Sequence, residues 1–126
     1  MVILDTDLII DYIRQLGNKN SHLAKLLEFM PAQDFAVSII TIQELYVGES
    51  SKVARKEEFF LKLINMLTIL PYEYEVAKLA GEIMRDIRPR VQFADAAIAA
   101  TAILNKAKLF TLNKKDFKGI SRLKLI

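Results

Sequence analysis

The chain has 126 residues, of which 52% are hydrophobic and 26% are charged, and it contains no cysteine. This length and composition are typical of one globular domain and exclude a disordered or fibrous protein. The lack of cysteine excludes a disulfide framework and a thiolate metal site. The formal net charge of +3 is compatible with a phosphate-bearing partner without requiring one.

The apolar run at the start of the chain, Met1 to Leu4, meets Asp5 at once and is too short for a secretion signal. No stretch of about 20 uncharged apolar residues is present that would cross a bilayer. Linkers, repeats and low-complexity tracts are also absent. We therefore expect a cytoplasmic protein in which residues 1–126 form a single domain.

Short β-rich runs alternate with longer segments of helical periodicity along the chain. The expected strands are Val2 to Leu4, Phe35 to Ser38, Leu67 to Leu70, Leu109 to Leu112 and Leu123 to Ile126. The expected helices are Asp7 to Leu16, Ser21 to Met30, Ile42 to Glu49, Val53 to Asn65, Glu73 to Ile87 and Ala94 to Lys106. Such alternation predicts an α/β fold with a parallel sheet covered by helices on both faces.

Acidic residues follow the first two predicted strands. Asp5 and Asp7 come directly after the first strand, and Glu44 lies near the start of the helix after the second. Each has a local explanation, because aspartate caps helix N-termini and Thr41 with Glu44 fits a capping box. Taken singly, each acid would be assigned to capping.

Two further polar positions lie later in the chain. Asp95 is the only acid in ADAAIAATAIL, a small and apolar segment typical of a helix packed against the centre of a sheet. Its place near a helix N-terminus also suits the helix dipole. Asn113 and Asp116 follow the fourth predicted strand, and their spacing resembles a second capping device.

The carboxyl ends of parallel strands meet at one edge of a sheet, and ligands bind at that edge. Asp5, Glu44, Asp95 and the pair of Asn113 and Asp116 are therefore expected to converge there. Carboxylates gathered in a partly apolar cleft repel one another unless they are protonated or neutralised by cations. Oxygen ligands without cysteine or a histidine cluster favour Mg²⁺ or Mn²⁺ over zinc.

Four motifs, ILDTD, ITIQELYVGES, FADAAIAATAI and LFTLNKKDF, occur in this order along nearly the whole chain. Together they resemble the PIN domain family, and most closely its VapC-type ribonuclease toxins of prokaryotic toxin-antitoxin pairs. The resemblance implies an α/β/α sandwich with a central parallel sheet, and a Mg²⁺- or Mn²⁺-dependent endoribonuclease that cleaves single-stranded RNA. It also implies a cognate antitoxin protein and a homodimer, with the Val53 to Asn65 helix as an interface candidate.

Carried over motif by motif, the resemblance implies that Asp5, Glu44, Asp95 and Asp116 are the catalytic residues. The implied metal ligands are these four acids and Asn113. Many relatives have aspartate where Asn113 stands, and we expect Asp116 to supply the missing charge. Relatives often have asparagine where this chain has Asp7, which adds a charge without removing a ligand.

The expected chemistry is hydrolysis of a phosphodiester bond assisted by a metal, which polarises the phosphoryl oxygen and activates a water molecule. Thr6 and Thr111 lie beside the acids, and their hydroxyls are candidate contacts to phosphate or water. Lys114 and Lys115 flank the fourth motif and are candidate phosphate contacts. A capping or strand role for the threonines, and plain solvation for the lysines, are the competing interpretations.

Three other functions share some of these features. A haloacid dehalogenase-type phosphatase also begins with a strand and Asp-x-Asp, but it continues with a Gly-Thr-like turn where this chain has Leu8 and Ile9 in a predicted helix. A receiver-type signalling domain has its phosphate-accepting aspartate after the third strand, where this chain has Leu70 and Pro71. A PIN-like interaction module that has lost catalysis is the third alternative.

Overall fold

Four parallel strands form the centre of the protein in the computed structural model, which describes residues 1–126. The strands are β1 (Val2–Leu4), β2 (Phe35–Ser38), β3 (Thr68–Leu70) and β4 (Lys108–Phe110). They lie in the order β3-β2-β1-β4, and all three pairings are parallel. Crossovers between parallel strands require helices, and six α-helices supply them: α1 (Thr6–Arg14), α2 (His22–Leu27), α3 (Ile39–Val47), α4 (Ala54–Ile64), α5 (Tyr74–Asp86) and α6 (Phe93–Leu104).

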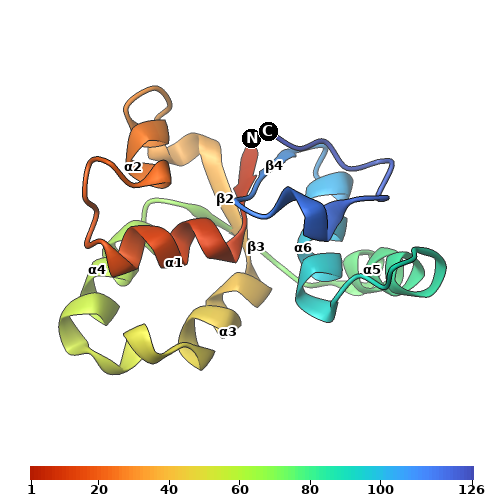
Figure 1. Ribbon diagram of the computed structural model, residues 1–126, viewed down its shortest axis with the longest axis horizontal. Coiled ribbons are helices and arrows are strands. Elements are labelled where there is room, and N and C mark those ends of the chain that lie inside the picture. The colour runs from red at the N-terminus through yellow and green to blue at the C-terminus, as the bar shows by residue number, and fades with distance from the viewer.

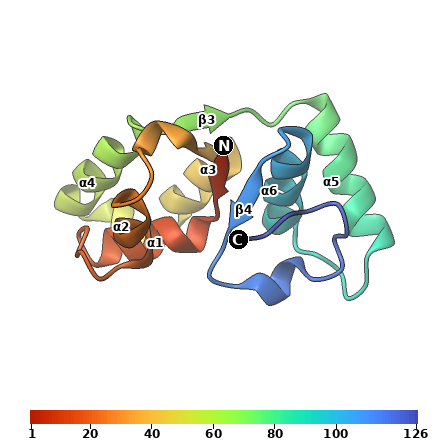
Figure 2. The same ribbon diagram turned by 90° about the horizontal axis from the view of Figure 1, so that it is seen from above.

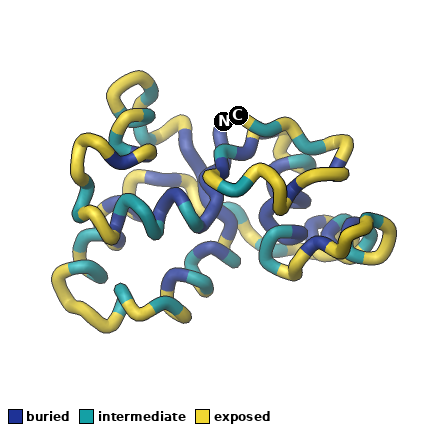
Figure 3. The backbone as a smooth tube through the Cα atoms, viewed as in Figure 1, coloured by how far each residue is buried: buried dark blue, intermediate teal, exposed yellow.

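Helices cover both faces of the sheet, as the strand-helix alternation predicted (Figures 1 and 2). Alternate residues of a strand point to opposite faces. Ile3, Ala36 and Leu109 therefore pack with α5 and α6, whereas the neighbouring residues Leu4 and Phe35 belong to a second core under α1, α2 and α4. In Figure 3 the tube is dark blue along β1 and β2, the two central strands, which are buried throughout. The α/β/α sandwich with a central parallel sheet is confirmed.

Helix α6 has the most continuous burial in the chain. Its residues from Ala96 to Ala102 are all buried, and five of the seven are alanine. Small side chains let the helix approach both the sheet and α5 closely, which explains why the segment is apolar almost all round. Asp95 stands at the N-terminal end of this buried run and is only partly buried.

The expected strand boundaries are confirmed for β1 and β2, but the prediction was wrong at the C-terminus. Residues from Leu123 to Ile126 form no strand and make a single bridge, between Leu125 and Leu109. This short tail lies beside β4 and brings the C-terminus next to the N-terminus (Figure 1). Strand β4 ends at Phe110, so Thr111 belongs to the loop that follows it.

The capping box predicted for Thr41 and Glu44 was also wrong. Helix α3 begins at Ile39, and its cap is Ser38, whose hydroxyl accepts a hydrogen bond from the Ile40 N–H. Thr41 and Glu44 lie inside the helix, so their side chains are free for other partners. No helix in the structure has the length and apolar character needed to span a membrane.

Candidate active site

The polar residues singled out by the sequence lie where β1, β2 and β4 end. Asp5 joins β1 to α1, and Glu44 projects from α3, the helix that follows β2. Thr111 and Asn113 follow β4, and Asp95 lies in the first turn of α6. The edge of the sheet formed by the carboxyl ends of the strands therefore collects these residues from distant parts of the chain.

Asp5 is held by hydrogen bonds to both carboxylate oxygens. The residue is 6% exposed, and its Oδ1 accepts from the backbone N–H of Thr6 at 2.8 Å. Its Oδ2 accepts from the Thr111 hydroxyl at 2.7 Å, and the Thr111 oxygen in turn accepts from the Asn113 N–H at 3.0 Å. Asp5 thus caps α1, as its position allowed, and it also ties β1 to the loop after β4.

Glu44 is joined to the start of α1 by a threonine. The Thr6 hydroxyl donates to Oε1 of Glu44 at 2.6 Å, and the hydroxyl oxygens of Thr6 and Thr41 lie 3.1 Å apart in a hydrogen bond. Thr6 and Thr41 are both buried. This contact fixes the direction in which α3 presents Glu44. Together with Asp5 and Thr111, these residues form what we call the buried half of the site.

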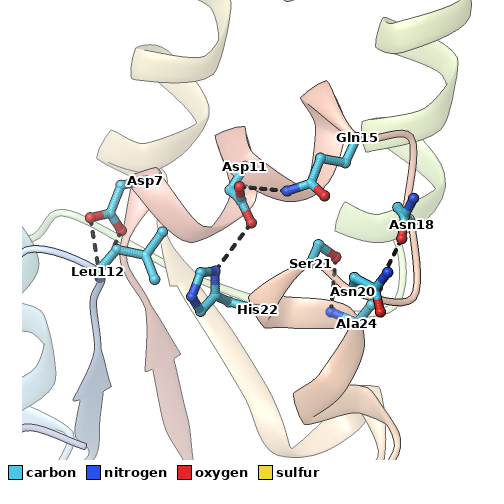
Figure 4. A network of polar contacts seen from close by, with 9 residues as sticks. All are labelled: Asp7, Asp11, Gln15, Asn18, Asn20, Ser21, His22, Ala24 and Leu112. Atoms are coloured by element: carbon cyan, nitrogen blue, oxygen red, sulfur yellow. Dashed lines mark hydrogen bonds and ion pairs between the residues drawn. The ribbon is translucent and has the colours of Figure 1, made fainter.

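Asp7, in the first turn of α1, also connects this helix to the loop after β4. Its carboxylate accepts from the backbone N–H of Leu112 at 3.2 and 3.4 Å (Figure 4). One turn further along α1, Asp11 contacts Nδ1 of His22 at 3.5 Å. The only histidine of the chain is therefore paired away from the cluster of acids at the strand ends.

Asp95 and Asp116 form a more exposed part, which we call the open half of the site. Asp116 lies in the 3₁₀ helix η3 (Lys114–Phe117), and the side-chain amide of Asn113 donates to its Oδ2. Asp95 and Asp116 both line an open cavity of about 510 Å³. Lys115 lines the same cavity, whereas Lys114 is exposed outside it.

Burial and mutual repulsion raise the pKa values of three of the acids. Burial is the main cause that raises the pKa of Asp5 to about 7, and the negative charges of Asp7 and Asp95 add to it. The pKa of Asp95 rises to about 6, first because of burial and then because of the charges of Asp116, Glu44 and Asp7. Burial also raises the pKa of Asp7. The two halves therefore lie close enough for their charges to interact.

The donor atoms of the site suit a hard divalent cation, because they are carboxylate and amide oxygens without sulfur or imidazole. No three acidic or histidine side chains lie close enough together to surround one ion directly. Mg²⁺ commonly keeps several water ligands and uses only one or two carboxylates from the protein. The arrangement therefore fits a hydrated ion, held partly through water, better than a closed cage of side chains.

Sequence reasoning missed several residues of this region. Arg88, Arg90 and Lys118 line the cavity beside Asp95, but they lie outside the four motifs from which the site was predicted. Thr41 was assigned to a helix cap and instead contacts Thr6. The two arginines in one turn, next to a helix that carries an acid, could have indicated the cavity from the sequence. Nothing in the sequence indicated the contact between Thr41 and Thr6.

Residues 2–123 match the family model described as PIN domain. Ribonuclease VapC10 from Mycobacterium tuberculosis is 28% identical over 98% of this chain and 91% of its own length. The structure is similar to a toxin-antitoxin complex from Klebsiella pneumoniae, with a TM-score of 0.77 and 26% identity over 100% of this chain and 96% of that chain. It is also similar to VapBC2 from Rickettsia felis bound to a promoter DNA fragment, with a TM-score of 0.76 and 28% identity over 100% and 98%. The chain belongs to the PIN domain family.

Proposed function

We propose that this protein is a metal-dependent endoribonuclease that cleaves single-stranded RNA and acts as the toxin of a toxin-antitoxin pair. The observation that carries the proposal is the convergence of Asp5, Glu44, Asp95 and Asp116 at the carboxyl edge of the sheet, with the pKa values of Asp5 and Asp95 raised. Membership of the PIN domain family and the similarity to Ribonuclease VapC10 support the same activity.

In this proposal Asp5, Glu44, Asp95 and Asp116, with Asn113, hold Mg²⁺ or Mn²⁺ directly or through water. When bound, the ion stabilises negative charge on the phosphoryl group and lowers the pKa of a bound water molecule. In the proposed reaction a water molecule would lose a proton to a carboxylate of the site or to solvent as its oxygen bonds to phosphorus, and the leaving oxygen would take up a proton as its bond to phosphorus breaks. The acids orient the water and exclude other approaches to the phosphorus atom.

The threonines contribute by fixing the acids. The hydroxyl of Thr111 donates to Asp5, and that of Thr6 donates to Glu44, so both protons are already used inside the protein. We therefore propose that Thr6 and Thr111 act on the substrate through the carboxylates that they position. Partners of this kind, which hold metal ligands in place, commonly change metal affinity or activity by about 10- to 100-fold when mutated.

The protein partners follow from the same comparisons. Similarity to a toxin-antitoxin complex supports a cognate antitoxin protein for this chain. We also propose that the protein acts in the cytoplasm. A homodimer is supported by exposed apolar side chains on three successive elements, because Leu61 of α4, Ile69 of β3 and Tyr74 of α5 are 42%, 44% and 77% exposed. Within α4 itself, Phe60 is 1% exposed and belongs to the core. A monomer mass in light scattering at every protein concentration would contradict the dimer.

Among the competing functions, the phosphatase and receiver interpretations are not supported, because the family match is to the PIN domain over nearly the whole chain. A PIN-like module without catalysis is the remaining alternative, and the presence of all four acids favours the enzyme over it.

The deciding experiment is cleavage of a pool of single-stranded RNA oligonucleotides of random sequence by the purified chain. We expect cleavage in Mg²⁺ or Mn²⁺ and none in excess EDTA, and gel or sequencing analysis would show the cleavage sites. Restored cleavage after metal is added back excludes damage by the chelator. A folded protein that cleaves nothing in either metal would favour the non-catalytic module.

A further inference from the structure

Two separate segments of the chain border the cavity beside Asp95 and Asp116. One is the connection between α5 and α6, from Arg88 to Gln92, and the other runs from Lys115 to Gly119 around η3. The volume is about 510 Å³, and Val91 is the only hydrophobic residue that lines it. Most of the lining residues are therefore polar or charged, and two of them are the acids of the open half.

Most of the cations that line this cavity have no partner in the protein. The four ion pairs of the chain are His22–Asp11, Lys52–Glu49, Lys62–Glu58 and Arg85–Asp86. Arg90, Lys115 and Lys118 belong to none of them, although Asp95 and Asp116 line the same cavity. The acids and the cations of this cavity are thus more than 4 Å apart, and each group remains available to a ligand.

Arg88 differs from the other cations because it is already used by the fold. Its Nη1 donates to the carbonyl oxygens of Ile87 at 2.9 Å, Arg85 at 3.0 Å and Met84 at 3.3 Å, at the C-terminal end of α5. These bonds satisfy carbonyls that the helix itself leaves open. Arg88 therefore shapes the segment that presents Arg90.

The composition of the lining indicates which part of a nucleic acid would bind. No aromatic residue lines the cavity, so it offers no ring on which a base could stack. Arginine and lysine instead contact phosphate oxygens and neutralise their charge. The cavity thus suits the backbone of a strand and not its bases.

We propose that this cavity binds the RNA strand next to the bond that is cleaved, with Arg90 and Lys118 contacting phosphates that flank the scissile one. This inference rests on the proposed ribonuclease function and adds the surface that holds the substrate. The bound strand continues from the acids of the open half into the cavity. Because the contacts are to phosphate, this part of the site recognises RNA without selecting its sequence.

The test measures RNA binding separately from cleavage. Fluorescence anisotropy measures the binding of a fluorescein-labelled single-stranded RNA in Mg²⁺. The protein used is Asp5→Asn, because this substitution is expected to stop cleavage and Asp5 lies outside the cavity. Adding Arg90→Ala and Lys118→Ala should weaken binding roughly tenfold at moderate salt. The slope of log K against log salt should become shallower by about 1.4, since each phosphate contact to a single strand contributes about 0.7.

The matched control removes two exposed cations from the other side of the sheet, with Lys19→Ala and Lys25→Ala in the same background. Neither lysine takes part in an ion pair, and both lie in the α1–α2 region, so the net charge falls equally without touching the cavity. Unchanged binding by the control and weaker binding by the cavity variant, on RNAs of unrelated sequence, would support the inference.

Three outcomes would overturn it. Equal losses in the two double variants would show that net charge, and not this cavity, binds the strand. An unchanged salt slope in the cavity variant would remove Arg90 and Lys118 from the phosphate contacts, while leaving the proposed ribonuclease function intact. If the wild-type chain neither binds nor cleaves any RNA, the proposed function itself fails, which is a different result from a selective failure of the cavity variant.

Discussion

Asp5 and Asp95 stand at the same edge of the sheet, but their surroundings differ. Asp5 is buried and accepts hydrogen bonds from Thr6 and Thr111. Asp95 is half-buried, and burial and three negative charges raise its pKa without a hydrogen bond to offset them. The carboxylate of Asp5 is therefore held by hydrogen bonds within the protein, whereas that of Asp95 has no such bond.

This difference between the two halves predicts that substitutions in them affect stability and activity differently. A buried polar group that loses its hydrogen-bond partner costs about 1–3 kcal/mol, so changes in the buried half should affect both folding and activity. In the open half the acids repel one another and are partly solvated, so removing a charge there should not weaken the fold.

The largest expected effect is on cleavage in Asp95→Asn. The substitution removes a ligand charge while keeping the side-chain volume, so we expect cleavage to fall by more than about 100-fold. The midpoint of urea unfolding should not fall, because a source of repulsion is removed. Asp34→Asn, an exposed acid in the 3₁₀ helix before β2, is the control and should change neither quantity. Cleavage at the wild-type rate by folded Asp95→Asn would remove this residue from the catalytic set.

A combined loss is expected for Thr111→Val. Valine has a similar shape but leaves Oδ2 of Asp5 and the Asn113 N–H without the hydroxyl between them. We expect about 1–3 kcal/mol less free energy of unfolding and a reduction in cleavage of about 10- to 100-fold. Urea unfolding and cleavage rates measure the two effects. Thr68→Val, at an exposed position of β3, is the matched control. A loss of activity without a loss of stability would show that Thr111 contacts the substrate instead.

The raised pKa values predict how metal and pH act together on thermal stability. In the folded protein the pKa of Asp5 is about 7 and that of Asp95 about 6, so the folded state holds protons more tightly than the unfolded chain. Without metal, stability should therefore fall as pH rises from about 4, near the pKa of an unfolded aspartate, to about 7, the folded pKa of Asp5. Millimolar Mg²⁺ or Mn²⁺ should raise the Tm most at the upper end of this range, where the carboxylates are ionised.

Calorimetry or thermal fluorescence, with and without EDTA, measures this dependence. The triple variant Asp5→Asn, Glu44→Gln, Asp95→Asn is the control, and it should lose both the metal-induced gain and most of the pH slope. Equal shifts with metal in the wild type and the triple variant would contradict a shared site.

The smallest expected effect concerns Asn113 and Asp116. Asn113 supplies an oxygen without charge directly after β4, and Asp116 supplies the charge from η3, where Asn113 donates to it. Asp116→Asn should raise the Mg²⁺ concentration needed for cleavage by roughly tenfold, less than for Asp95→Asn. Asn113→Asp should keep activity. Rates titrated against Mg²⁺ provide the test, and unchanged metal dependence in Asp116→Asn would reduce that residue to a structural role.

The sequence by itself determined the strand-helix alternation and the boundaries of β1 and β2, because hydrophobic periodicity and strand propensity act over a few neighbouring residues. It also determined that Asp5 and Asn113 follow strands, and parallel strands place their carboxyl ends at one edge. Convergence of the acids was therefore predictable before the order of the strands was known.

Only the tertiary structure decided the contacts that hold those acids. Thr111 reaches Asp5 across 106 positions and Thr6 reaches Glu44 across 38, and both bonds depend on which segments lie beside β1. The local pattern at Thr41 and Glu44 favoured a cap, but the helix begins earlier, at Ile39, where the Ser38 side chain caps it. Likewise, the cavity lined by Arg90 and Lys118 exists because α5, α6 and η3 pack together, and no short-range signal fixes such an arrangement.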